Sequence, residues 1–582
     1  MAQSSDNLRV AALLFALCCL AYGGAVKNGL VADDHVLVAS APLWSDWRNA
    51  PRLFTSPLPH TLAGAFVYYR PVVSLSFLAD YQLWGLELGA FRLTNIVLHA
   101  ANGALVYAVT KALFASGSAA LLAALIFAAH PLHAEVVDHV YNRAEALATL
   151  FRLLTCLLFV RSRETTGPRS TALYIGSLAG LVAALLSKES GVTLPLVILA
   201  IEVWGPRGRG PLPALLARHA PFWALAGLYL ALRATVLFRV SVELPRSLDA
   251  LAALWQVTRG LTLYLRLVCF PVWLYLEYPL TRIGGAEAAF ALVLALAAGG
   301  VLYAVLSRDG MRRLWLALVW LLAALLPLVP TSINRATVDA DRYLYAPYSC
   351  LVFIAGLALG ECVGVRGSRP KRTLLVALTL GLALSGSILA SRQTRFWENE
   401  VTQWTRKFSG SPQDLRIQSS LNAALFAAGH PQRAVIRMER LAAKHPEDLR
   451  ARLNLGLAWL RLGAWGAALP HLEWAAQAQP TKVDALLGLA TASLALRQNE
   501  RAESLLRAVL ARDPFHAPAH QLLARLYEST RRTGEAAEHY QALLQVERDP
   551  TRRAALRQKL DSLHIKKPAA EEATPARPPS SP

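Results

Sequence analysis

Long apolar runs separated by short polar connections make up the first two thirds of the chain. Most have roughly the 17 to 25 residues that an α-helix needs to cross the hydrocarbon core of a bilayer. The runs are 8–26, 92–110, 119–136, 145–160, 171–187, 190–204, 220–238, 286–306, 313–330, 345–362 and 373–391. They predict an all-α, polytopic membrane region over residues 1–391, with about 11 transmembrane helices.

After residue 391 the pattern changes to a repeat of 34 residues. The period is kept by Pro412, Pro446, Pro480 and Pro514, by Leu421, Leu455, Leu489 and Leu523, and by Ala434, Ala468, Ala502 and Ala536. This period is that of tetratricopeptide (TPR) helical hairpins, which have small residues where their helices cross closely and Pro at the end of each unit. We therefore expect a TPR α-solenoid of about four repeats over 414–550, with a concave groove.

Two further segments complete the predicted domain organisation. Residues 392–413 are expected to link the membrane region to the repeats. Residues 551–582 are expected to form a terminal helix followed by a disordered tail, because the last part is rich in Pro and poor in large apolar residues.

The composition supports a membrane protein and argues against a nucleic-acid partner. Of the 582 residues, 54% are hydrophobic and 17% are charged, and the mean hydropathy is +0.36. The formal net charge of +20 comes from short basic clusters between apolar runs, not from one basic stripe. We interpret these clusters as topology signals.

The distribution of Lys and Arg predicts the orientation in the membrane. If the N-terminus is cytoplasmic, the inside connections carry 14 Lys and Arg in 52 residues and the outside connections carry 13 in 145. This asymmetry fits the positive-inside rule. It places the loop after the first helix and the TPR region outside the cytoplasm. Because the Ala-, Leu- and Arg-rich composition is typical of bacteria, we expect a periplasmic TPR region and an inner-membrane location.

Two apolar segments decide whether this topology holds. The run 8–26 is expected to stay as a signal anchor, because Asp6 offsets its only basic flank, Arg9, and no convincing cleavage site follows. Residues 251–278 are apolar enough to span but carry Arg259 and Arg266 in mid-run, where a charge is costly unless it is buried or functional. We expect an interfacial or re-entrant helix; a true span would put the TPR region in the cytoplasm.

Short polar signatures occur where the predicted helices end. The predicted topology places nearly all of them on the non-cytoplasmic side, and this convergence is the main sign of a functional site. The signatures are DD at 33–34, YRP at 69–71, RLTN at 92–95, HPLHAE at 130–135, YNRAE at 141–145, SKESG at 187–191 and DRYLY at 341–345. The six cysteines, by contrast, show no metal-binding spacing and predict neither a zinc site nor a disulfide framework.

In this order, and followed by TPR repeats, the signatures resemble those of the transmembrane-and-TPR-containing O-mannosyltransferases and their bacterial relatives. The similarity rests on DD, YRPVVSLSFLADYQLWG, FRLTNIVLHAANGALV, HPLHAEVVDHVYNRAEALA, SKESG and DRYLY. It implies a GT-C glycosyltransferase that takes a sugar from a polyprenyl- or dolichyl-phosphate carrier on the non-cytoplasmic face. The chain has fewer TPR units than eukaryotic members, which leaves the sugar and the acceptor open.

The resemblance implies roles for several residues. Asp33 or Asp34 would be the base that activates the acceptor hydroxyl; one carboxylate is enough because phosphate leaves without protonation. The other carboxylate could orient the acceptor or bind a divalent cation, so a metal stays open, while no soluble cofactor is required. The remaining candidates are Arg143, Lys188 and Arg342 for the donor phosphate, and His130, His133, Glu189 and Tyr343 for orienting the substrate.

Simpler interpretations of the same residues stay open. An acidic pair just after a helix is most often a solvated loop. Arg143 with Glu145, and Lys188 with Glu189, could be ordinary ion pairs. Arg342 could be an interfacial anchor, and the two histidines lack a third ligand at a fixed spacing, which argues against a metal site.

The predicted function is the transfer of a hexose, mannose by the resemblance, from a polyprenyl phosphate to a Ser/Thr or other acceptor hydroxyl with inversion. The TPR groove is expected to bind the acceptor or a partner protein, unless it only packs on the membrane region. The alternatives are a lipid or sugar transporter or flippase, and a non-enzymatic TPR scaffold. Residues 1–391 show no internal repeat of the kind found in many transporters, and a scaffold leaves the polar signatures unexplained.

Overall fold

The structure, a computed structural model, falls into two compact units, Met1–Pro412 and Gln413–Pro582. It describes residues 2–31, 34–35, 41–55, 68–114, 116–205, 211–237, 250–272, 274–276, 278–279, 289, 292–293, 295–296, 299, 308–328, 337–338, 341–363, 369–547 and 550–563. Every structural statement below concerns these residues.

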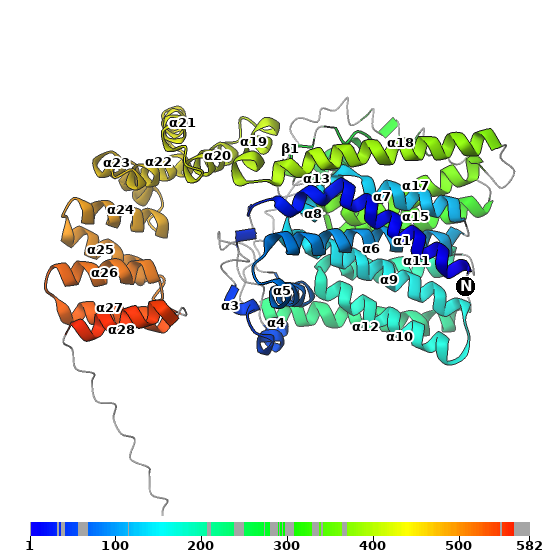
Figure 1. The fold of residues 1–582 in the computed structure, drawn as a ribbon, viewed down its shortest axis with the longest axis horizontal. Helices are drawn as coiled ribbons and strands as arrows, with labels where there is room; N and C mark the ends of the chain where they lie inside the picture. Colours follow the sequence, from blue (N-terminus) through cyan, green and yellow to red (C-terminus); the bar gives the residue numbers. More distant parts are fainter. Residues whose placement is uncertain are drawn as a thin grey trace, which may run out of the picture. The chain divides into compact units, whose positions relative to one another are not determined.

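The first unit is built from helices, most of them long (Figure 1). These are α1 (Ala2–Tyr22), α5 (Pro71–Trp84), α6 (Leu88–Phe114), α7 (Gly117–Ala129), α9 (Arg143–Glu164), α10 (Gly167–Ser187), α11 (Leu194–Trp204), α12 (Leu212–Leu237), α13 (Ala250–Cys269), α15 (Arg308–Leu325), α17 (Tyr345–Val363), α18 (Arg369–Thr394) and α19 (Glu400–Gly410). The predicted linker thus contains α19, whose Arg406 donates to the carbonyl of Leu274 in the first unit at 2.6 Å.

Short helical turns connect these helices and carry most of the polar signatures. They are η1 (Gly23–Lys27), α3 (Ala41–Trp44), η2 (Trp47–Asn49), α4 (Ala50–Thr55), η3 (Pro131–His133), α8 (Ala134–Asp138), η4 (Val140–Asn142), η5 (Glu189–Thr193), η7 (Leu326–Leu328), η8 (Arg342–Leu344) and η9 (Arg395–Trp397). A two-residue antiparallel pair joins β1 (Tyr278–Pro279) to β2 (Thr337–Val338), with Tyr278 opposite Val338. Apart from this short pair, the elements of the described residues are helices, and the structure confirms the predicted all-α class.

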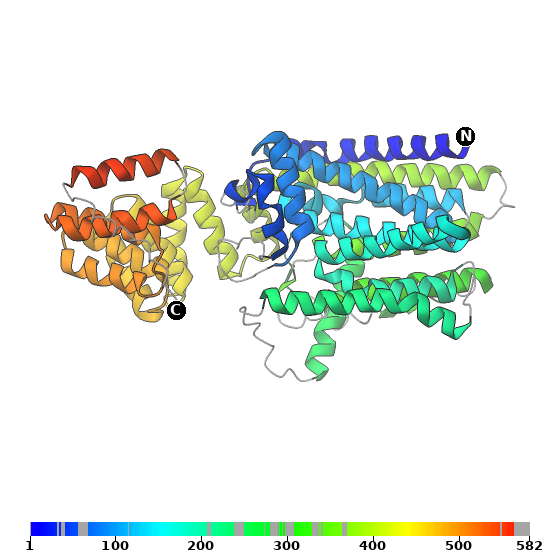
Figure 2. The same cartoon turned by 90° about the horizontal axis from the view of Figure 1, so that it is seen from below.

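Close approach of helix backbones shapes the core of the first unit. A Cβ atom at Gly180 in α10 would lie 2.5 Å from Oγ1 of Thr155 in α9, and one at Gly356 in α17 would lie 2.8 Å from the carbonyl oxygen of Ala119 in α7. Small residues at helix crossings are typical of helix packing in membranes. Figure 2 shows α1, α6, α9 and α10 running along one another.

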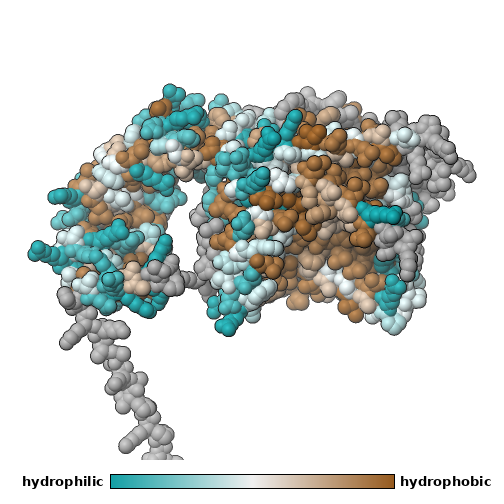
Figure 3. All heavy atoms as spheres, in the orientation of Figure 1, coloured by the Kyte–Doolittle hydropathy of each residue, from teal (hydrophilic) through white to brown (hydrophobic). Residues whose placement is uncertain are grey.

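Several helices meet the length and composition needed to cross a bilayer. Among the described residues these are Asp6–Lys27, Leu88–Phe114, Gly167–Ser187 and Leu212–Thr235, with a fifth if Gly117–Ala129 and Pro131–Asp138, bent by 51°, form one span. Apolar side chains cover the middle of the first unit in Figure 3, and polar ones gather toward both ends. These features support an integral membrane protein, while the count of about 11 transmembrane helices stays a prediction.

The segment with two arginines in mid-run forms α13. One stripe of this helix is buried, with Leu263, Tyr264 and Leu267 packed into the core of the first unit, whereas Leu261 and Arg266 are exposed. Over residues 257–269, where its side chains are described, the helix is thus packed along one side. Its predicted interfacial or re-entrant position remains a prediction.

The second unit consists of paired antiparallel helices and a terminal helix (Figure 1). The pairs are α20 (Leu415–Ala427) with α21 (Pro431–Lys444), α22 (Leu449–Arg461) with α23 (Trp465–Ala478), α24 (Val483–Ala495) with α25 (Asn499–Leu510), and α26 (Ala517–Ser529) with α27 (Thr533–Val546), followed by α28 (Pro550–Ser562). The turn inside each pair contains one residue with positive φ, at Gly429, Gly463, Arg497 and Arg531, again 34 residues apart.

The close helix crossing expected from the repeat is seen at Gly456 in α22. A Cβ atom there would lie 2.7 Å from Cγ of Leu472 in α23. Leu455, Ala468 and Leu472 are buried around this crossing. The hairpin can therefore close only because the residue at the crossing has no side chain.

Candidate active site

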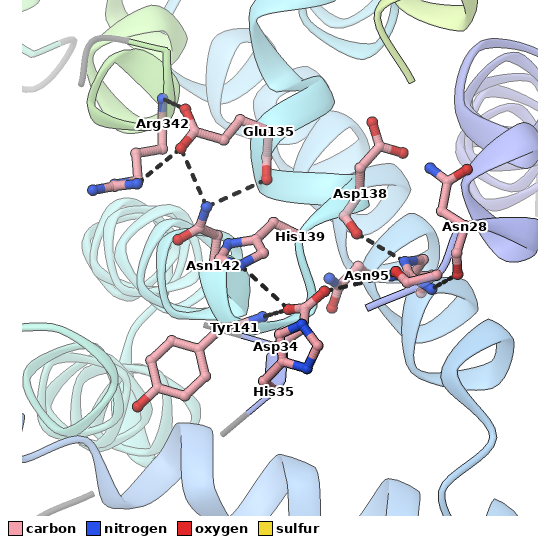
Figure 4. A network of polar contacts seen from close by, with 12 residues as sticks. Asn28, Asp34, His35, Asn95, Glu135, Asp138, His139, Tyr141, Asn142 and Arg342 are labelled. Atoms are coloured by element: carbon pink, nitrogen blue, oxygen red, sulfur yellow. Dashed lines mark hydrogen bonds and ion pairs between the residues drawn. The ribbon is translucent and has the colours of Figure 1, made fainter. Parts of the chain in front are cut away.

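Asp34 is a fully buried carboxylate held by contacts from two other parts of the chain (Figure 4). Its Oδ2 accepts from Nη2 of Arg92 in α6 at 3.4 Å, and its Oδ1 accepts from the backbone N–H of Tyr141 at 3.1 Å. Nε2 of His139 lies 3.4 Å from the same Oδ1, and the His139 ring stacks on Trp397. The carboxylate is therefore fixed in position on both of its oxygens.

Arg92 connects the Asp34 segment to two neighbouring elements. Besides Asp34, its guanidinium donates to the carbonyl oxygens of Asn28 and Gly29, and to that of Asp138 at the end of α8 at 2.9 Å. Arg92 is itself fully buried. A guanidinium has five donors in a fixed plane, so one side chain can hold the loop after η1 against α6 and α8.

A second group of charged residues forms a cation cluster, which we define as Arg70, Lys188 and Arg342. Each cation faces a glutamate: Arg70 lies 3.0 Å from Glu189, Arg342 lies 2.9 Å from Glu135, and Lys188 pairs with Glu145. Arg70 directly precedes α5, Lys188 directly precedes η5, and Arg342 is the first residue of η8.

Two tyrosine rings lie under the cation cluster. The Arg70 guanidinium is 4.0 Å from the centroid of Tyr68, and the Tyr343 ring lies 5.0 Å from Arg342 and 5.3 Å from Lys188. Aromatic faces attract cations. The two rings therefore add to the attraction that the glutamates exert on the three cations.

The cation cluster and Asp34 are joined by the segment between α8 and α9 (Figure 4). The Asn142 side chain donates to Oε1 of Glu135 at 3.4 Å, and Glu135 also accepts the backbone N–H of Arg342 at 2.9 Å. The neighbouring residue Tyr141 donates its backbone N–H to Asp34. One short segment thus contacts both the buried carboxylate and Glu135, the partner of Arg342.

The charges of the cation cluster depend on one another, and its members lie outside the helices that could span a membrane. Burial, together with the neighbouring charges of Arg70 and Arg342, lowers the pKa of Lys188 to about 7, whereas Glu189 and Glu135 act in the opposite direction. Burial alone would raise the pKa of Glu189, but Arg70 and Lys188 lower it to about 2. Glu189 is therefore an anion at neutral pH, and Lys188 titrates there.

Arg143 has partners different from those of the other predicted phosphate ligands. It is fully buried, lies 2.6 Å from Oδ2 of Asp80, and donates to Oδ1 of Asn95 and the carbonyl of Phe91, each at 2.7 Å. It also lies over the Phe77 ring. The structure thus brings Lys188, Arg342, Glu189 and Tyr343 together, and gives Arg143 contacts to α5 and α6 instead.

His130 and His133 lie in a buried aromatic group. The His130 ring is 4.3 Å from that of Tyr348, and the His133 ring is 4.7 Å from that of Tyr345. Nε2 of His130 lies 3.3 Å from the carbonyl oxygen of Val268 in α13. Their predicted contact with substrate stays a prediction, and Asp33 lies outside the described residues.

Four residues at this site were given no role from the sequence: Arg70, Arg92, Glu135 and His139. Arg70, Arg92 and Glu135 lie inside the short signatures identified there, and His139 lies between two of them. The signal was therefore present, but which members of a signature face one another depends on helix orientation. As for metals, the described residues contain no group of three or more His, Cys, Asp or Glu side chains placed to hold an ion.

Comparison with known proteins gives matches in both units of the chain. Residues 71–238 match the family described as dolichyl-phosphate-mannose-protein mannosyltransferase. Residues 424–483, 460–526 and 494–560 match tetratricopeptide repeats. The chain is homologous to protein O-mannosyl-transferases. The resemblance expected from the sequence and the TPR repeats are therefore confirmed.

The similarity to individual relatives is modest. Protein O-mannosyl-transferase tmtc2 of Xenopus laevis is 37% identical over 146 residues, which are 25% of this chain and 18% of that protein. Human protein O-mannosyl-transferase TMTC1 is 26% identical over 497 residues, 73% of this chain and 54% of that protein. The chain spans less than two thirds of the length of these relatives. A thermophilic TPR protein of Thermus thermophilus, TTC0263, has a TM-score of 0.25 at 22% identity, and the match covers 32% of this chain and 95% of that one.

Proposed function

We propose that the protein is a membrane glycosyltransferase that moves mannose from a polyprenyl-phosphate carrier to a hydroxyl group of a protein acceptor. The observation that carries this proposal is the pairing of a fixed, buried carboxylate, Asp34, with the cation cluster through one short segment. The family match over residues 71–238 supports the sugar and the lipid carrier. The homology to protein O-mannosyl-transferases supports a protein acceptor.

The proposed reaction is a single displacement at the anomeric carbon. Asp33 or Asp34 takes the proton of the acceptor hydroxyl while its oxygen attacks that carbon from the face opposite the phosphate. The bond between the carbon and the phosphate oxygen breaks, and the polyprenyl phosphate leaves with the electron pair, so the configuration inverts. Phosphate is a good leaving group without protonation, and the acid used in ordinary glycoside hydrolysis is not needed.

The cation cluster is the proposed site of the donor phosphate. Lys188 and Arg342 were expected there, and Arg70 joins them because it shares Glu189 and Tyr68 with the same group. Fixed positive charge that is already in place stabilises the developing phosphate charge without reorganisation. In the proposal Glu135, Glu145 and Glu189 hold the cations until the donor arrives, and Glu189 and Tyr343 orient the sugar.

Arg143, His130 and His133 keep their proposed roles, but each has protein contacts of its own that bear on how it could act. The contacts of Arg143 with Asp80 and Asn95 support a positioning role. They fix the first residue of α9, and the two residues directly before it, Tyr141 and Asn142, contact Asp34 and Glu135. A direct contact of Arg143 with the phosphate would require these bonds to break. The two histidines would act from the aromatic group formed with Tyr345 and Tyr348.

We further propose that the site and the TPR unit lie outside the cytoplasm, in the periplasm of a bacterial cell. The excess of Lys and Arg in the opposite connections supports this orientation. The TPR unit would then bind the acceptor or a partner protein in its groove, as helical repeats do with extended peptides.

The decisive experiment is a transfer assay with purified protein, polyprenyl-phosphate mannose carrying a radiolabel, and acceptor protein. Asp33→Asn, Asp34→Asn and the double variant are compared with Asp46→Asn, an exposed aspartate of the same loop region. We expect loss of transfer in at least one of the single variants and in the double variant, and normal transfer in Asp46→Asn. Undiminished transfer by the double variant would refute the assignment, and lipid flux without covalent transfer would favour a transporter.

A further inference from the structure

A pocket lies at the other end of α9 and α10 from the candidate active site. α9 begins at Arg143 and ends at Glu164, and α10 runs back from Gly167 to Ser187, next to Lys188. A helix of 22 residues is about 33 Å long, close to the thickness of a bilayer core. Figure 1 shows the α9–α10 turn at the same end of the bundle as the N-terminus. The pocket and the candidate active site therefore lie at opposite ends of a helix pair that is long enough to cross a bilayer.

The pocket is a cavity of about 370 Å³ between three helix ends. The last turn of α9 contributes Arg163, the first turns of α10 contribute Ser170 and Tyr174, and α12 contributes Ala217 and Arg218. A volume of this size is in the range of small-ligand sites. It is large enough for a phosphate group together with the adjoining part of a lipid headgroup.

The wall of the pocket carries an excess of positive charge. Arg163 lies 3.4 Å from the Glu202 carboxylate, Nε of Arg218 donates to the same carboxylate at 3.1 Å, and Nε2 of His219 lies 3.3 Å from it. Glu202 is buried, with only 1% of its side chain exposed, whereas the side chains of Arg163 and Arg218 are 33% and 25% exposed. Two partly exposed guanidinium groups thus share one buried carboxylate, so their combined charge exceeds that of Glu202.

Local contacts of the lining residues shape the pocket on two sides. On one side, Ser170 of α10 lines the pocket, and its hydroxyl donates to the carbonyl of Ser162 at the end of α9 at 2.7 Å. Across the pocket, Pro221 lies inside α12 and has no N–H to donate to the carbonyl of Ala217. The Tyr174 hydroxyl donates to the carbonyl of Arg218 at 2.7 Å and fixes this turn.

The surroundings of the pocket are those of a lipid-facing surface. Leu212 and Leu216 on α12 and Ile175 on α10 are 64%, 60% and 59% exposed. A soluble anion needs only the charged wall, whereas a phospholipid also covers apolar side chains beside it with its acyl chains. Basic pockets between membrane helices are typical sites for anionic headgroups.

We propose that this pocket binds the phosphate group of an anionic phospholipid in the leaflet at the N-terminal end of the bundle. The guanidinium groups of Arg163 and Arg218 bind the phosphate oxygens, and the exposed leucines of α12 contact the acyl chains. The bound lipid ties α12 to the α9–α10 turn. Because it binds the folded protein, it raises the melting temperature as its occupancy increases.

The test uses the full-length protein purified in detergent and compares three additions at equal phosphate concentration: dioleoyl phosphatidylglycerol, dioleoyl phosphatidylcholine and inorganic phosphate. Thermal unfolding gives the Tm, and native mass spectrometry counts bound lipids. The pocket is filled by Ala217→Trp, which leaves every ion pair in place; Ala220→Trp is the matched control, because Ala220 is exposed on the same helix but does not line the pocket.

We expect phosphatidylglycerol to raise the Tm of the natural protein and of Ala220→Trp by about 3 °C or more, and to add one retained lipid. Ala217→Trp should lose both effects. A second variant, Arg163→Gln, should weaken lipid binding severalfold while Arg218 still pairs with Glu202. An equal response of Ala217→Trp and Ala220→Trp would overturn the site, and an equal effect of inorganic phosphate would overturn the assignment to a lipid.

Discussion

Lys188 is the residue of the candidate site whose charge is most sensitive to pH. It faces Glu145 from α9, Glu189 from η5, Glu135 from α8, and the cations Arg70 and Arg342. Burial and the two arginines outweigh the carboxylates and lower its pKa to about 7. A lysine with this pKa is charged below pH 7 and loses its charge as the pH rises through that value. Its affinity for phosphate therefore depends on the proton.

We predict that kcat/KM for the donor falls as the pH rises from 6 to 9, because only protonated Lys188 attracts the phosphate of the incoming lipid. Lys188→Arg keeps its charge throughout this range and should show no such fall. The measurement is the initial rate of mannose transfer at low donor concentration across the pH range. A parallel profile for both proteins would show that another group titrates.

The same shift has a consequence for stability with the opposite sign. The unfolded chain keeps the proton on this lysine up to its usual pKa of 10.5, whereas the folded protein releases it near pH 7. Between these values the unfolded state binds more protons, and the contribution of Lys188 to the free energy of unfolding rises with pH. Loss of transfer at high pH would therefore not be caused by unfolding through this group.

At the scale of elements, the crossing of α22 and α23 shows how strictly a repeat specifies its small residues. We predict that Gly456→Ala lowers the free energy of unfolding of this hairpin by about 1–3 kcal/mol, because the added carbon overlaps Leu472 in a packed core. Gly466→Ala is the contrasting variant: nothing lies within 4 Å of its added carbon, and replacing a helical glycine should stabilise by about 0.5–1 kcal/mol.

Hydrogen–deuterium exchange of the α22 and α23 amides in the full-length protein measures these changes locally. Faster exchange in Gly456→Ala and slower exchange in Gly466→Ala are expected. If both variants shift exchange in the same direction, the crossing does not depend on the missing side chain.

The repeats also show what a periodic sequence does and does not reveal. Pro, Leu and Ala recur at fixed positions of the 34-residue repeat and make the hairpins predictable, because each has the same structural role in every unit. The left-handed turn position was not predictable in the same way. It holds Gly429 and Gly463 in two repeats but Arg497 and Arg531 in the other two. An arginine gives no sign of positive φ in a sequence, so its conformation follows from the fold around it.

At the scale of the whole molecule, the proposed orientation leads to a labelling prediction. In a cysteine-free protein we introduce Ser45→Cys, Thr166→Cys or Glu447→Cys, all at exposed positions. An impermeant maleimide added to intact spheroplasts should label the first and the third, because the loop after α1 and the TPR unit are proposed to be outside. Thr166→Cys, in the α9–α10 turn, should react only after lysis.

The pattern of labelling also decides how α13 sits in the membrane. If Ser45→Cys reacts from outside but Glu447→Cys reacts only after lysis, the chain crosses the membrane an odd number of times between them, as it would if the segment containing α13 spanned the bilayer. The TPR unit would then be cytoplasmic. In that case it could not meet an acceptor on the side of Asp34.

The candidate site was predictable as a set of signatures but not as a set of contacts. Apolar runs end where the signatures begin, and this alone brings them to one end of the bundle. Arg143 and Arg70 illustrate the remaining gap. Arg70 directly precedes α5 and Arg143 is the first residue of α9, and each lies within a signature. Arg143 nevertheless pairs with buried Asp80, whereas Arg70 pairs with partly exposed Glu189. The pairing depends on how α5 and α9 are rotated against each other, and a single sequence carries no measure of that rotation.

The Arg92 contacts described above also set an order of assembly. Asp34 is made 58 residues before Arg92 and 107 residues before Tyr141, so the first loop leaves the ribosome long before its partners exist. The site cannot form until α6 and the turn between α8 and α9 have been inserted. A nascent chain with only its first helix in the membrane holds Asp34 without the Arg92 guanidinium that pairs with it in the folded protein. Catalytic competence therefore appears late in biogenesis, as a by-product of completing the bundle.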